Sequence, residues 1–446
     1  MNVPVSSCYL TFRITSKAYF RIMKEEFLHY VWKYKKFAFA KLQTTTRLSI
    51  SLISVGMHNQ LAGPDFFNSQ LYIENQLWAG NVEIHLKSSD WYAHRHEADP
   101  AYDSVILHVV WEHDIDIFRL DNSAIPTLEL KKYVSKDTLS NYQTLFARQQ
   151  EKWINCESHL HEVPPSITDH WLERIYIERL EGKTQSIQSL LNQTHYDWEA
   201  VLFCMLARNF GTKINGLAFH SLAEAIDFGI VRKCARVPFQ LEALFLGMGG
   251  LLSENSTDSY VLQLHGEYEY LKSKFSLENE GVLPIQFFKL RPDNFPTIRL
   301  AQLAQLYHKH SDLFQKLMNI KTLNTCYEIL QVAASPYWDT HFSFATPQKK
   351  RTKRLTKTFM DLLLINTVIP LKFAYNQYQG TAEQEHILLL ISAIKPERNV
   401  IIQKYNSLGL PAKNAQETQA LLSLKTHYCG PNQCLSCGIG NWLIGK

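Results

Sequence analysis

Four polar residues in one region of the chain have the types and spacing to perform chemistry together. Asp65 follows a glycine and a proline, and Glu83, His85 and Lys87 alternate with apolar residues. In an extended strand alternate side chains share a face, so this spacing brings both carboxylates, an imidazole and an amine to one edge of a small sheet. Two carboxylates and a strand carbonyl suit Mg²⁺ or Mn²⁺. The chemistry predicted is metal-assisted hydrolysis of a phosphodiester.

The order Pro64-Asp65 followed by Glu83-Ile84-His85 resembles the motif of the PD-(D/E)XK nucleases. The resemblance implies a restriction-endonuclease-like fold, in which Asp65 and Glu83 bind Mg²⁺ or Mn²⁺. It also implies a nucleic-acid substrate, with DNA expected rather than RNA.

The motif departs from that family at one place, because His85 stands where the family has a lysine. Lys87 lies two residues later on the same face of the strand and is expected to assist. The superfamily often carries an auxiliary glutamate on its first helix. By that resemblance Glu26 is the expected residue, with Glu25 as a close alternative.

Three further histidines follow the motif. His94 and His96 lie in a polar loop, whereas His108 lies within an apolar strand and is expected to be a hydrogen-bonded core residue. A His-x-His loop can bind zinc or line an active site. These three histidines define the main alternative site, that of a His-ligated zinc or transition-metal hydrolase. A second alternative is a non-catalytic nucleic-acid-binding or scaffold protein without a working metal site.

The last eighteen residues contain three cysteines, Cys429, Cys434 and Cys437, shortly after His427. This spacing suits a structural Zn²⁺ ion or three corners of an iron–sulfur cluster, although three unliganded thiols remain an alternative. Some PD-(D/E)XK nucleases fasten their C-terminus with a four-cysteine cluster. By that resemblance a distant cysteine, such as Cys156 or Cys326, would be the fourth ligand.

A basic run between residues 349 and 357 has six cations in nine positions. Such a run is usually a solvated loop or the start of a helix, but it can also contact phosphates without reading sequence. The residues expected to contact nucleic acid are Lys349, Lys350, Arg351, Lys353 and Arg354. The chain shows no glycine-rich phosphate loop and no nucleophile elbow, which disfavours a nucleotide-driven motor and a serine hydrolase.

The periodicity of apolar residues predicts the elements that position these groups. It indicates a helix over 24–39 and then strands over 48–54, 69–73, 77–87, 104–111, 114–119 and 127–130. After about residue 135 the pattern is helical almost throughout. We therefore predict an α+β (α/β) protein, with an N-terminal mixed sheet and a leading helix before a large, mainly α-helical domain.

The predicted parts of the chain are a nuclease-like α/β domain over 23–135, a linker segment over 136–165, a helical domain over 166–420 and a cysteine-bearing tail over 421–446. Residues 1–22 form an extension that contains no acid. A true start at Met23 is preferred over a functional basic leader.

The 446 residues are 46% hydrophobic with a net charge of +4. This composition excludes wholesale disorder, and the small charge does not by itself mark a nucleic-acid binder. No apolar run reaches the roughly 18 residues of a membrane span, so no membrane partner is expected. Oligomeric state is left open by the sequence.

At the level of the whole chain, the histidine-rich motifs, the segment 291–299 and the closing cysteines are similar to an uncharacterised bacterial family, domain of unknown function 2851. The similarity covers nearly everything after Met23. It implies a cytoplasmic bacterial protein and assigns no activity, so the functional prediction rests on the residues of the site.

Overall fold

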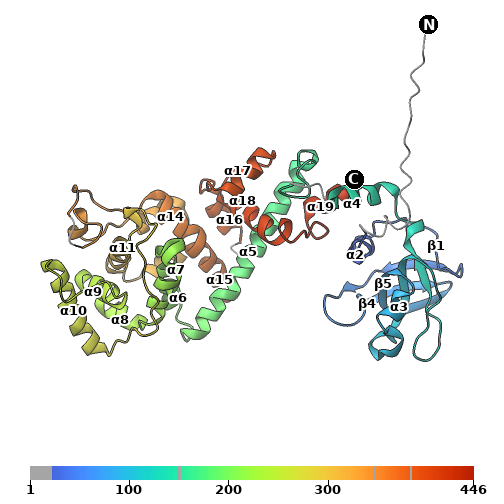
Figure 1. Cartoon of the computed structure of the whole chain (residues 1–446), viewed down its shortest axis with the longest axis horizontal. Helices are drawn as coiled ribbons and strands as arrows, with labels where there is room; N and C mark the ends of the chain where they lie inside the picture. Colours follow the sequence, from blue (N-terminus) through green and yellow to red (C-terminus); the bar gives the residue numbers. More distant parts are fainter. Residues whose placement is uncertain (1–22, 148–151, 345–346, 382–383) are drawn as a thin grey trace, which may run out of the picture. The chain divides into compact units, whose positions relative to one another are not determined.

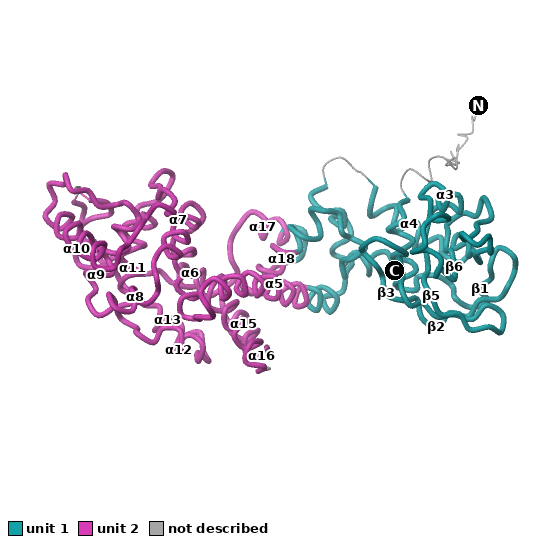
Figure 2. The backbone as a smooth tube through the Cα atoms, turned by 90° about the horizontal axis from the view of Figure 1, so that it is seen from below, with its two compact units in different colours: residues 1–171, 407–410, 424–446 teal, residues 172–406, 411–423 magenta. Residues whose placement is uncertain are grey.

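The computed structural model describes residues 23–147, 152–344, 347–381 and 384–446 (Figure 1), so the predicted extension over 1–22 lies outside it. The chain divides into two compact units, coloured separately in Figure 2. Unit 1 comprises Met1–Trp171, Ser407–Leu410 and Leu424–Lys446, and unit 2 comprises Leu172–Asn406 and Pro411–Ser423. The predicted α+β class is confirmed, since a mixed sheet with a leading helix precedes a large helical region.

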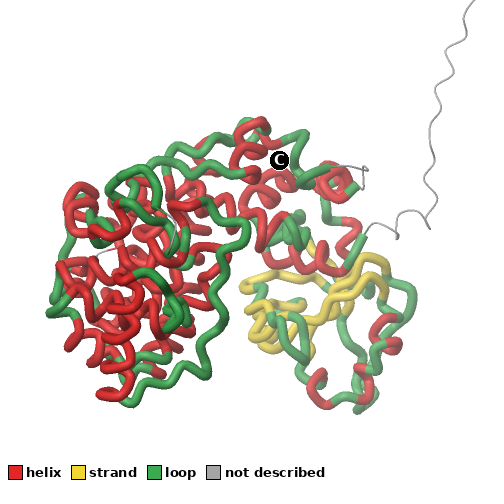
Figure 3. Tube along the Cα trace, turned by 60° about the vertical axis from the view of Figure 1, so that its left-hand side comes forward, coloured by secondary structure: helices red, strands yellow, loops and turns green. Residues whose placement is uncertain are grey.

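Unit 1 is built on one mixed sheet of seven strands, shown in yellow in Figure 3. The strands are β1 (Leu42–Gln43), β2 (Ser49–Ser54), β3 (Met57–His58), β4 (Phe66–Ile73), β5 (Gln76–Lys87), β6 (Val105–Glu112) and β7 (Thr127–Glu129). Their order is β1-β2-β4-β5-β6-β7, with β3 paired to β4. The β4–β5 pair is antiparallel, whereas β5, β6 and β7 run parallel. The centre of the sheet is therefore the β5–β6 pair.

Helices cover both faces of the β5–β6 pair. Helix α2 (Glu25–Lys33) packs Phe27 against Trp111 of β6, with ring centroids 6.4 Å apart. On the face where His108 lies, helix α3 (Asp90–Ala93) places Trp91 5.6 Å from that imidazole. Because Trp111 and His108 differ by an odd number of positions, they point to opposite faces. The middle of β5 is thus buried on both sides.

Two local features differ from the sequence prediction. The leading helix ends at Lys33 rather than continuing to residue 39, because Lys35 takes a left-handed conformation with φ of 50°. The predicted strand over 114–119 does not form, and only Phe118 makes an isolated bridge, to Ala124. Three of those six positions are charged, and Asp114 at the start of the segment accepts hydrogen bonds from the backbone N–H and the hydroxyl of Ser89.

Unit 1 also contains the segments predicted as a linker and as a tail. Residues 136–165 hold helix α4 (Lys136–Phe146), whose Tyr142 lies 4.2 Å from the ring of Phe27. Residues 424–446 form a π-helical turn (Leu424–Cys429) and helix α19 (Gly438–Gly445), which packs against α4.

Unit 2 is mainly helical among its described residues, and helix α5 runs from unit 1 into it. The helices are α5 (Pro165–Gln193), α6 (Trp198–Phe210), α7 (Thr212–Glu224), α8 (Phe228–Cys234), α9 (Pro238–Met248), α10 (Ser259–Phe275), α11 (Pro296–Lys309), α12 (Leu313–Met318), α13 (Leu323–Leu330), α14 (Lys357–Leu363), α15 (Ile369–Gln379), α16 (Gln384–Ser392), α17 (Val400–Ser407) and α18 (Ala415–Ser423). Helix α9 is buried over its last eight residues and forms the centre of this unit.

Among the described residues one helical stretch, Lys357–Gln379, is long and apolar enough to cross a membrane by length and composition. However, 72% of its apolar window is buried inside the protein. Core helices of soluble proteins pass the same test, so this stretch is weak support for a membrane span. The cytoplasmic location stays a prediction.

Candidate metal centre

The carboxylates of Asp65 and Glu83 lie together at the start of the β4–β5 pair. The backbone N–H of Asp65 donates to Oε2 of Glu83 at 3.1 Å, and the backbone N–H of Ile84 donates to Oδ2 of Asp65 at 3.0 Å. The β4–β5 ladder shifts register between Phe66 and Ser69. The two side chains therefore accept the N–H groups that a continuing ladder would have paired, and each carboxylate is held in place by the other's strand.

The second oxygen of Glu83 faces imidazoles. Oε1 of Glu83 lies 3.5 Å from Nε2 of His85 and 3.3 Å from Nε2 of His96. Nε2 of His85 is also 3.0 Å from Nδ1 of His94. The motif strand and the loop after it thus deliver three imidazoles to one point. His94 and His96 reach this point because Arg95 between them has a left-handed φ of 62°, which turns the chain back on itself.

This polar face of β5 is not solvated. Glu83 is 5% exposed and His85 is 2% exposed, so these two side chains do not lie on an ordinary solvated strand face. The ring of Tyr102 stacks on His96 with centroids 3.8 Å apart and covers it from the loop side. Nε2 of His96 is buried and makes no hydrogen bond. Leaving a buried nitrogen unpaired is unfavourable, so this atom needs a partner.

His108, on the neighbouring strand β6, contacts the imidazole of His85. Its Nε2 lies 2.8 Å from Nδ1 of His85, and its side chain is completely buried. Burial, followed by the charges of the neighbouring imidazoles, lowers the pKa of His85 to about 3 and the pKa of His108 well below its ordinary value. Both rings are therefore neutral near pH 7. When His85 donates its Nδ1 proton to His108, its Nε2 presents a lone pair to the cluster.

The three imidazoles fit a transition-metal ion better than Mg²⁺. One ring nitrogen from each of His85, His94 and His96 lies within 4.8 Å of the others. A tetrahedral zinc ion with bonds of about 2.0–2.1 Å keeps its ligand atoms roughly 3.3 Å apart, close to the 3.0 Å between His85 and His94. Imidazoles suit Zn²⁺ and similar ions, whereas Mg²⁺ takes oxygen ligands. The unpaired nitrogen of His96 gives a physical reason for an ion at this point.

His29 of helix α2 joins the cluster through Asp65, and the sequence analysis missed it. Its Nε2 lies 3.1 Å from Oδ2 of Asp65. Burial lowers the pKa of His29, but the hydrogen bond to Asp65 and the charges of Asp65, Glu25 and Glu83 raise it above the ordinary value on balance. Glu25 and His29 are four residues apart and share one face of the helix, a spacing that could have identified both.

Two residues expected at the site point elsewhere. The charges of His94, His29 and Asp65 all shift the pKa of Glu25, so this carboxyl lies near the site. Glu26 instead lines a separate cavity, and its charge raises the pKa of Tyr142. Residues next to each other on a helix face directions about 100° apart, so only one of the two glutamates can approach the sheet.

Lys87 is also directed away from the imidazoles. Its positive charge acts on Asp114, and its backbone N–H donates to Asp90 at 2.9 Å. Its assisting role at the site stays a prediction.

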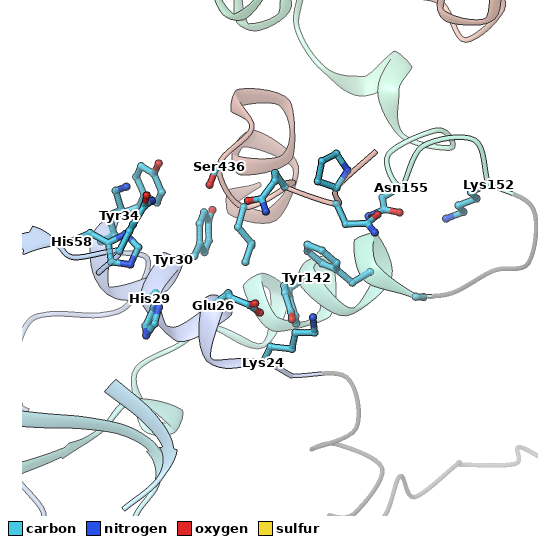
Figure 4. Close-up of a pocket in the computed structure, with 18 residues that line it drawn as sticks. Lys24, Glu26, His29, Tyr30, Tyr34, His58, Tyr142, Lys152, Asn155 and Ser436 are labelled. Carbon is cyan, nitrogen blue, oxygen red and sulfur yellow. The ribbon is translucent and has the colours of Figure 1, made fainter. Parts of the chain in front are cut away.

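The cavity on the other side of α2 has a volume of about 1110 Å³ (Figure 4). Its wall combines cations and aromatic rings: Lys24, Lys33, Lys152, Tyr30, Tyr34 and Tyr142. His29 lines this cavity and also contacts Asp65. The cavity and the imidazole cluster therefore share one side chain.

The predicted basic run lies in unit 2 and is not a uniform cationic surface. Lys349, Lys350 and Arg354 are exposed. Arg351 forms an ion pair with Asp293. Lys353 is 4% exposed and donates to backbone carbonyls, so this amine is not available to phosphate. A buried lysine must satisfy its ammonium locally, which its neighbouring carbonyls do.

The C-terminal cysteines lie in unit 1 together with Cys156. Burial, followed by the charges of Cys429, Cys437 and Cys434, raises the pKa of the Cys156 thiol, so these cysteines lie near it. His427 is exposed. Cys326 lies in helix α13 of unit 2, where its thiol donates to the carbonyl of Thr322. Of the two distant cysteines considered, the structure brings Cys156 to the tail.

Comparison with known proteins gives a family and no activity. No curated protein and no solved structure matches the chain. Residues 25–400 match the family described as protein of unknown function DUF2851. This match spans the sheet, the imidazole cluster and most of unit 2. The chain therefore belongs to the DUF2851 family.

Proposed function

We propose that the protein is a metal-dependent hydrolase that cleaves phosphodiesters of nucleic acid at the imidazole–carboxylate cluster of unit 1. The observation that carries this proposal is the cluster of His85, His94 and His96, which each bring a ring nitrogen within 4.8 Å of the others, with the buried Nε2 of His96 lacking a hydrogen bond. Buried polar atoms are nearly always paired, so an unpaired buried nitrogen beside two further imidazoles suits a cation.

The three imidazoles would hold Zn²⁺ or a similar ion. When bound, such an ion polarises the scissile group and lowers the pKa of its water. Mg²⁺ or Mn²⁺ on Asp65 and Glu83, as the PD-(D/E)XK resemblance implies, is the other possible loading. The donor chemistry favours the nitrogen-binding ion, because each carboxylate already accepts a backbone N–H with one oxygen.

The residues around the imidazoles are suited to move protons. Burial raises the pKa of Glu83, with a further rise from the charge of Asp65 against the lowering effect of His96. A carboxylate with a raised pKa is a better proton acceptor, so Oε1 of Glu83 would take the proton of the attacking water. The hydrogen bond to Asp65 raises the pKa of His29, which favours its protonated form, and its ring would donate a proton to the leaving oxygen.

The cavity beside α2 supports a nucleic-acid substrate. Lys24 and Lys33 offer charges for phosphates, and the exposed ring of Tyr34 offers a face on which a base can stack. His29 connects this cavity to Asp65, so a strand held there would pass beside the proton donor. The proposal thus assigns the cavity to the substrate and the cluster to the chemistry.

Cleavage assays test this function. Metal-stripped protein would be incubated with single- and double-stranded DNA and with RNA, and with Zn²⁺, Mn²⁺ or Mg²⁺. We expect cleavage that disappears in His96→Ala and Asp65→Asn. Glu242→Gln, which alters a buried glutamate in unit 2, is the matched control and should keep full activity. Inactivity of the wild-type protein on every substrate with every ion would contradict the proposal. So would equal cleavage by His96→Ala.

A further inference from the structure

Four cysteines among the described residues of unit 1, Cys156, Cys429, Cys434 and Cys437, form a second group, separate from the imidazole cluster. Cys156 and Cys437 are 9% and 7% exposed, and Cys429 and Cys434 are half-buried. Nδ2 of Asn155, the neighbour of Cys156, donates to Oδ1 of Asn432, which lies between Cys429 and Cys434, at 3.2 Å. The backbone N–H of Cys437 donates to the carbonyl of Cys434 at 3.3 Å. Four thiols from two segments that are far apart in the sequence therefore lie close together in the fold, and neither segment alone supplies all four.

Hydrogen-bond donors surround these thiols and point to their sulfur atoms. Nδ2 of Asn155 donates to Sγ of Cys434 at 3.4 Å. The backbone N–H groups of Ile439 and Gly440 are directed at Sγ of Cys437. N–H donors that surround a sulfur are the outer-shell contacts that orient and tune metal-bound thiolates. At Gly440 a Cβ would collide with the carbonyl of Cys434, so the close turn requires glycine.

The two segments are also fastened to each other away from the thiols. Nζ of Lys425 donates to the carbonyl of Trp153 at 2.7 Å and lies over its ring. The ring of Tyr428 meets that of Trp171 at 5.3 Å. The position of Cys156 relative to the tail is therefore fixed by packing on both sides.

The spacing of the sulfurs distinguishes between kinds of metal centre. Among the described residues, His85, His94 and His96 form the group of three or more ligand atoms that all lie within 4.8 Å of one another, and the thiols do not form another. A single zinc ion with bonds of about 2.3 Å would hold its thiolates roughly 3.8 Å apart. A cluster of several irons binds each thiolate through a different iron and holds them farther apart.

We propose that Cys156, Cys429, Cys434 and Cys437 bind one four-iron iron–sulfur cluster that fastens the C-terminal segment to the body of unit 1. Each cysteine binds as a thiolate, and its proton passes to solvent as the iron–sulfur bond forms. The cavity beside α2 is lined by residues between these ligands: Pro431, Asn432, Gln433, Leu435 and Ser436. The cluster therefore also holds one wall of that cavity. This proposal stands whether or not the imidazole cluster is catalytic.

Metal analysis of the full-length chain tests this proposal. The protein would be purified without oxygen, and iron, acid-labile sulfide and zinc would be measured with the visible absorption spectrum. We expect about four irons and four sulfides per chain with iron–sulfur charge-transfer bands. We expect Cys156→Ser to lose at least nine-tenths of the iron. Cys326→Ser removes a buried thiol of unit 2 and should keep the full complement.

The wild-type content decides the question even if Cys156→Ser does not fold. Stoichiometric zinc without iron in the wild-type chain would overturn the proposal, and so would the absence of both metals. Equal iron in the wild-type chain and a folded Cys156→Ser would overturn the assignment of that ligand. Hydrogen exchange over 425–445 gives a second readout, because removal of the cluster should increase exchange there and leave β5 unchanged.

Discussion

Two buried glutamates, one in each unit, show how differently the protein treats a carboxylate in its interior. Glu242 of unit 2 is 1% exposed, and its Oε1 accepts hydrogen bonds from Tyr260 at 2.8 Å and from Trp338 at 2.6 Å. Glu83 of unit 1 is almost as buried, but its Oε1 faces the ring nitrogens of His85 and His96 at distances longer than good hydrogen bonds.

The contrast separates a structural acid from one that is poised for chemistry. The neutral donors of Tyr260 and Trp338 satisfy Oε1 of Glu242 with hydrogen bonds, so this oxygen needs no further partner. The surroundings of Glu83 include a buried nitrogen of His96 that lies 3.3 Å from Oε1 without forming a hydrogen bond, and a second carboxylate at Asp65. Proteins keep incompletely satisfied polar groups where a ligand or a proton transfer uses them. Changing the two glutamates should therefore affect different properties.

The largest expected effect is on catalysis. Glu83→Gln removes the proposed proton acceptor and should reduce hydrolysis about 1,000-fold, within the range for general bases. The imidazoles remain, so bound metal should be retained, and the stability of unit 1 should not fall because the buried charge is gone. Rates and metal content would be measured on the same preparation. Activity within about threefold of the wild-type protein would remove Glu83 from the mechanism.

The second effect is on stability, and it belongs to Glu242. Glu242→Ala leaves the N–H of Trp338 and the O–H of Tyr260 without their acceptor, which should cost about 2 kcal/mol. Urea unfolding followed by tryptophan fluorescence would measure it. The folded fraction should hydrolyse substrate at the wild-type rate. A loss below about 0.5 kcal/mol would show that Glu242 is not a structural acid, and the comparison would fail.

The third effect is a dependence of stability on pH, which we expect only in the sheet of the metal-free protein. Because burial lowers the pKa of His85 to about 3, the unfolded chain binds a proton near pH 6.5 that the folded chain binds only near pH 3. Stability is thus complete above pH 6.5 and falls as the pH drops, by about 1.4 kcal/mol per pH unit for each such histidine.

Hydrogen exchange of β5 and β6 amides in metal-stripped protein measures this dependence. Protection should decrease as the pH is lowered from 6.5, after correction for intrinsic exchange. His108→Gln removes a second buried imidazole whose pKa is lowered in the same way and should reduce the slope. A flat profile in the wild-type protein would show that the imidazoles are not held neutral by burial.

The smallest effect concerns the cavity. Lys33→Gln removes one exposed cation of the cavity wall and should weaken nucleic-acid binding less than tenfold, with a reduction of about one in the salt slope. Lys136→Gln, which removes an exposed lysine of α4 outside the wall, is the matched control. Equal salt slopes for both variants would place the substrate elsewhere.

The sequence predicted the strand that carries the site but not what surrounds it. Alternation along β5 placed Glu83 and His85 on one face, because the period of a strand is fixed by its backbone. The same alternation could not show that α3 and the turn at Arg95 would bury that face. Burial depends on elements that approach from elsewhere in the chain.

The sequence also could not show which way a residue on a helix faces, or which distant residues contact each other in the fold. The choice between Glu25 and Glu26 depended on the rotation of α2 against the sheet, which hydrophobic periodicity defines only coarsely. Lys353 is part of a basic run in sequence, but tertiary contacts with backbone carbonyls bury it. His29 was missed because a single histidine on a helix carries no motif.

The most direct test of the central claim, that the imidazole cluster binds a transition-metal ion, is a titration of metal-stripped protein with Co²⁺ under absorption spectroscopy. Nitrogen and oxygen ligands give ligand-field bands without the strong charge-transfer band of thiolates, so this titration separates the imidazole site from the cysteines. We predict one such ion per chain in the wild-type protein and in Glu83→Gln, and none in His96→Ala. Binding that is absent from the wild-type protein, or equal in His96→Ala, would contradict the claim.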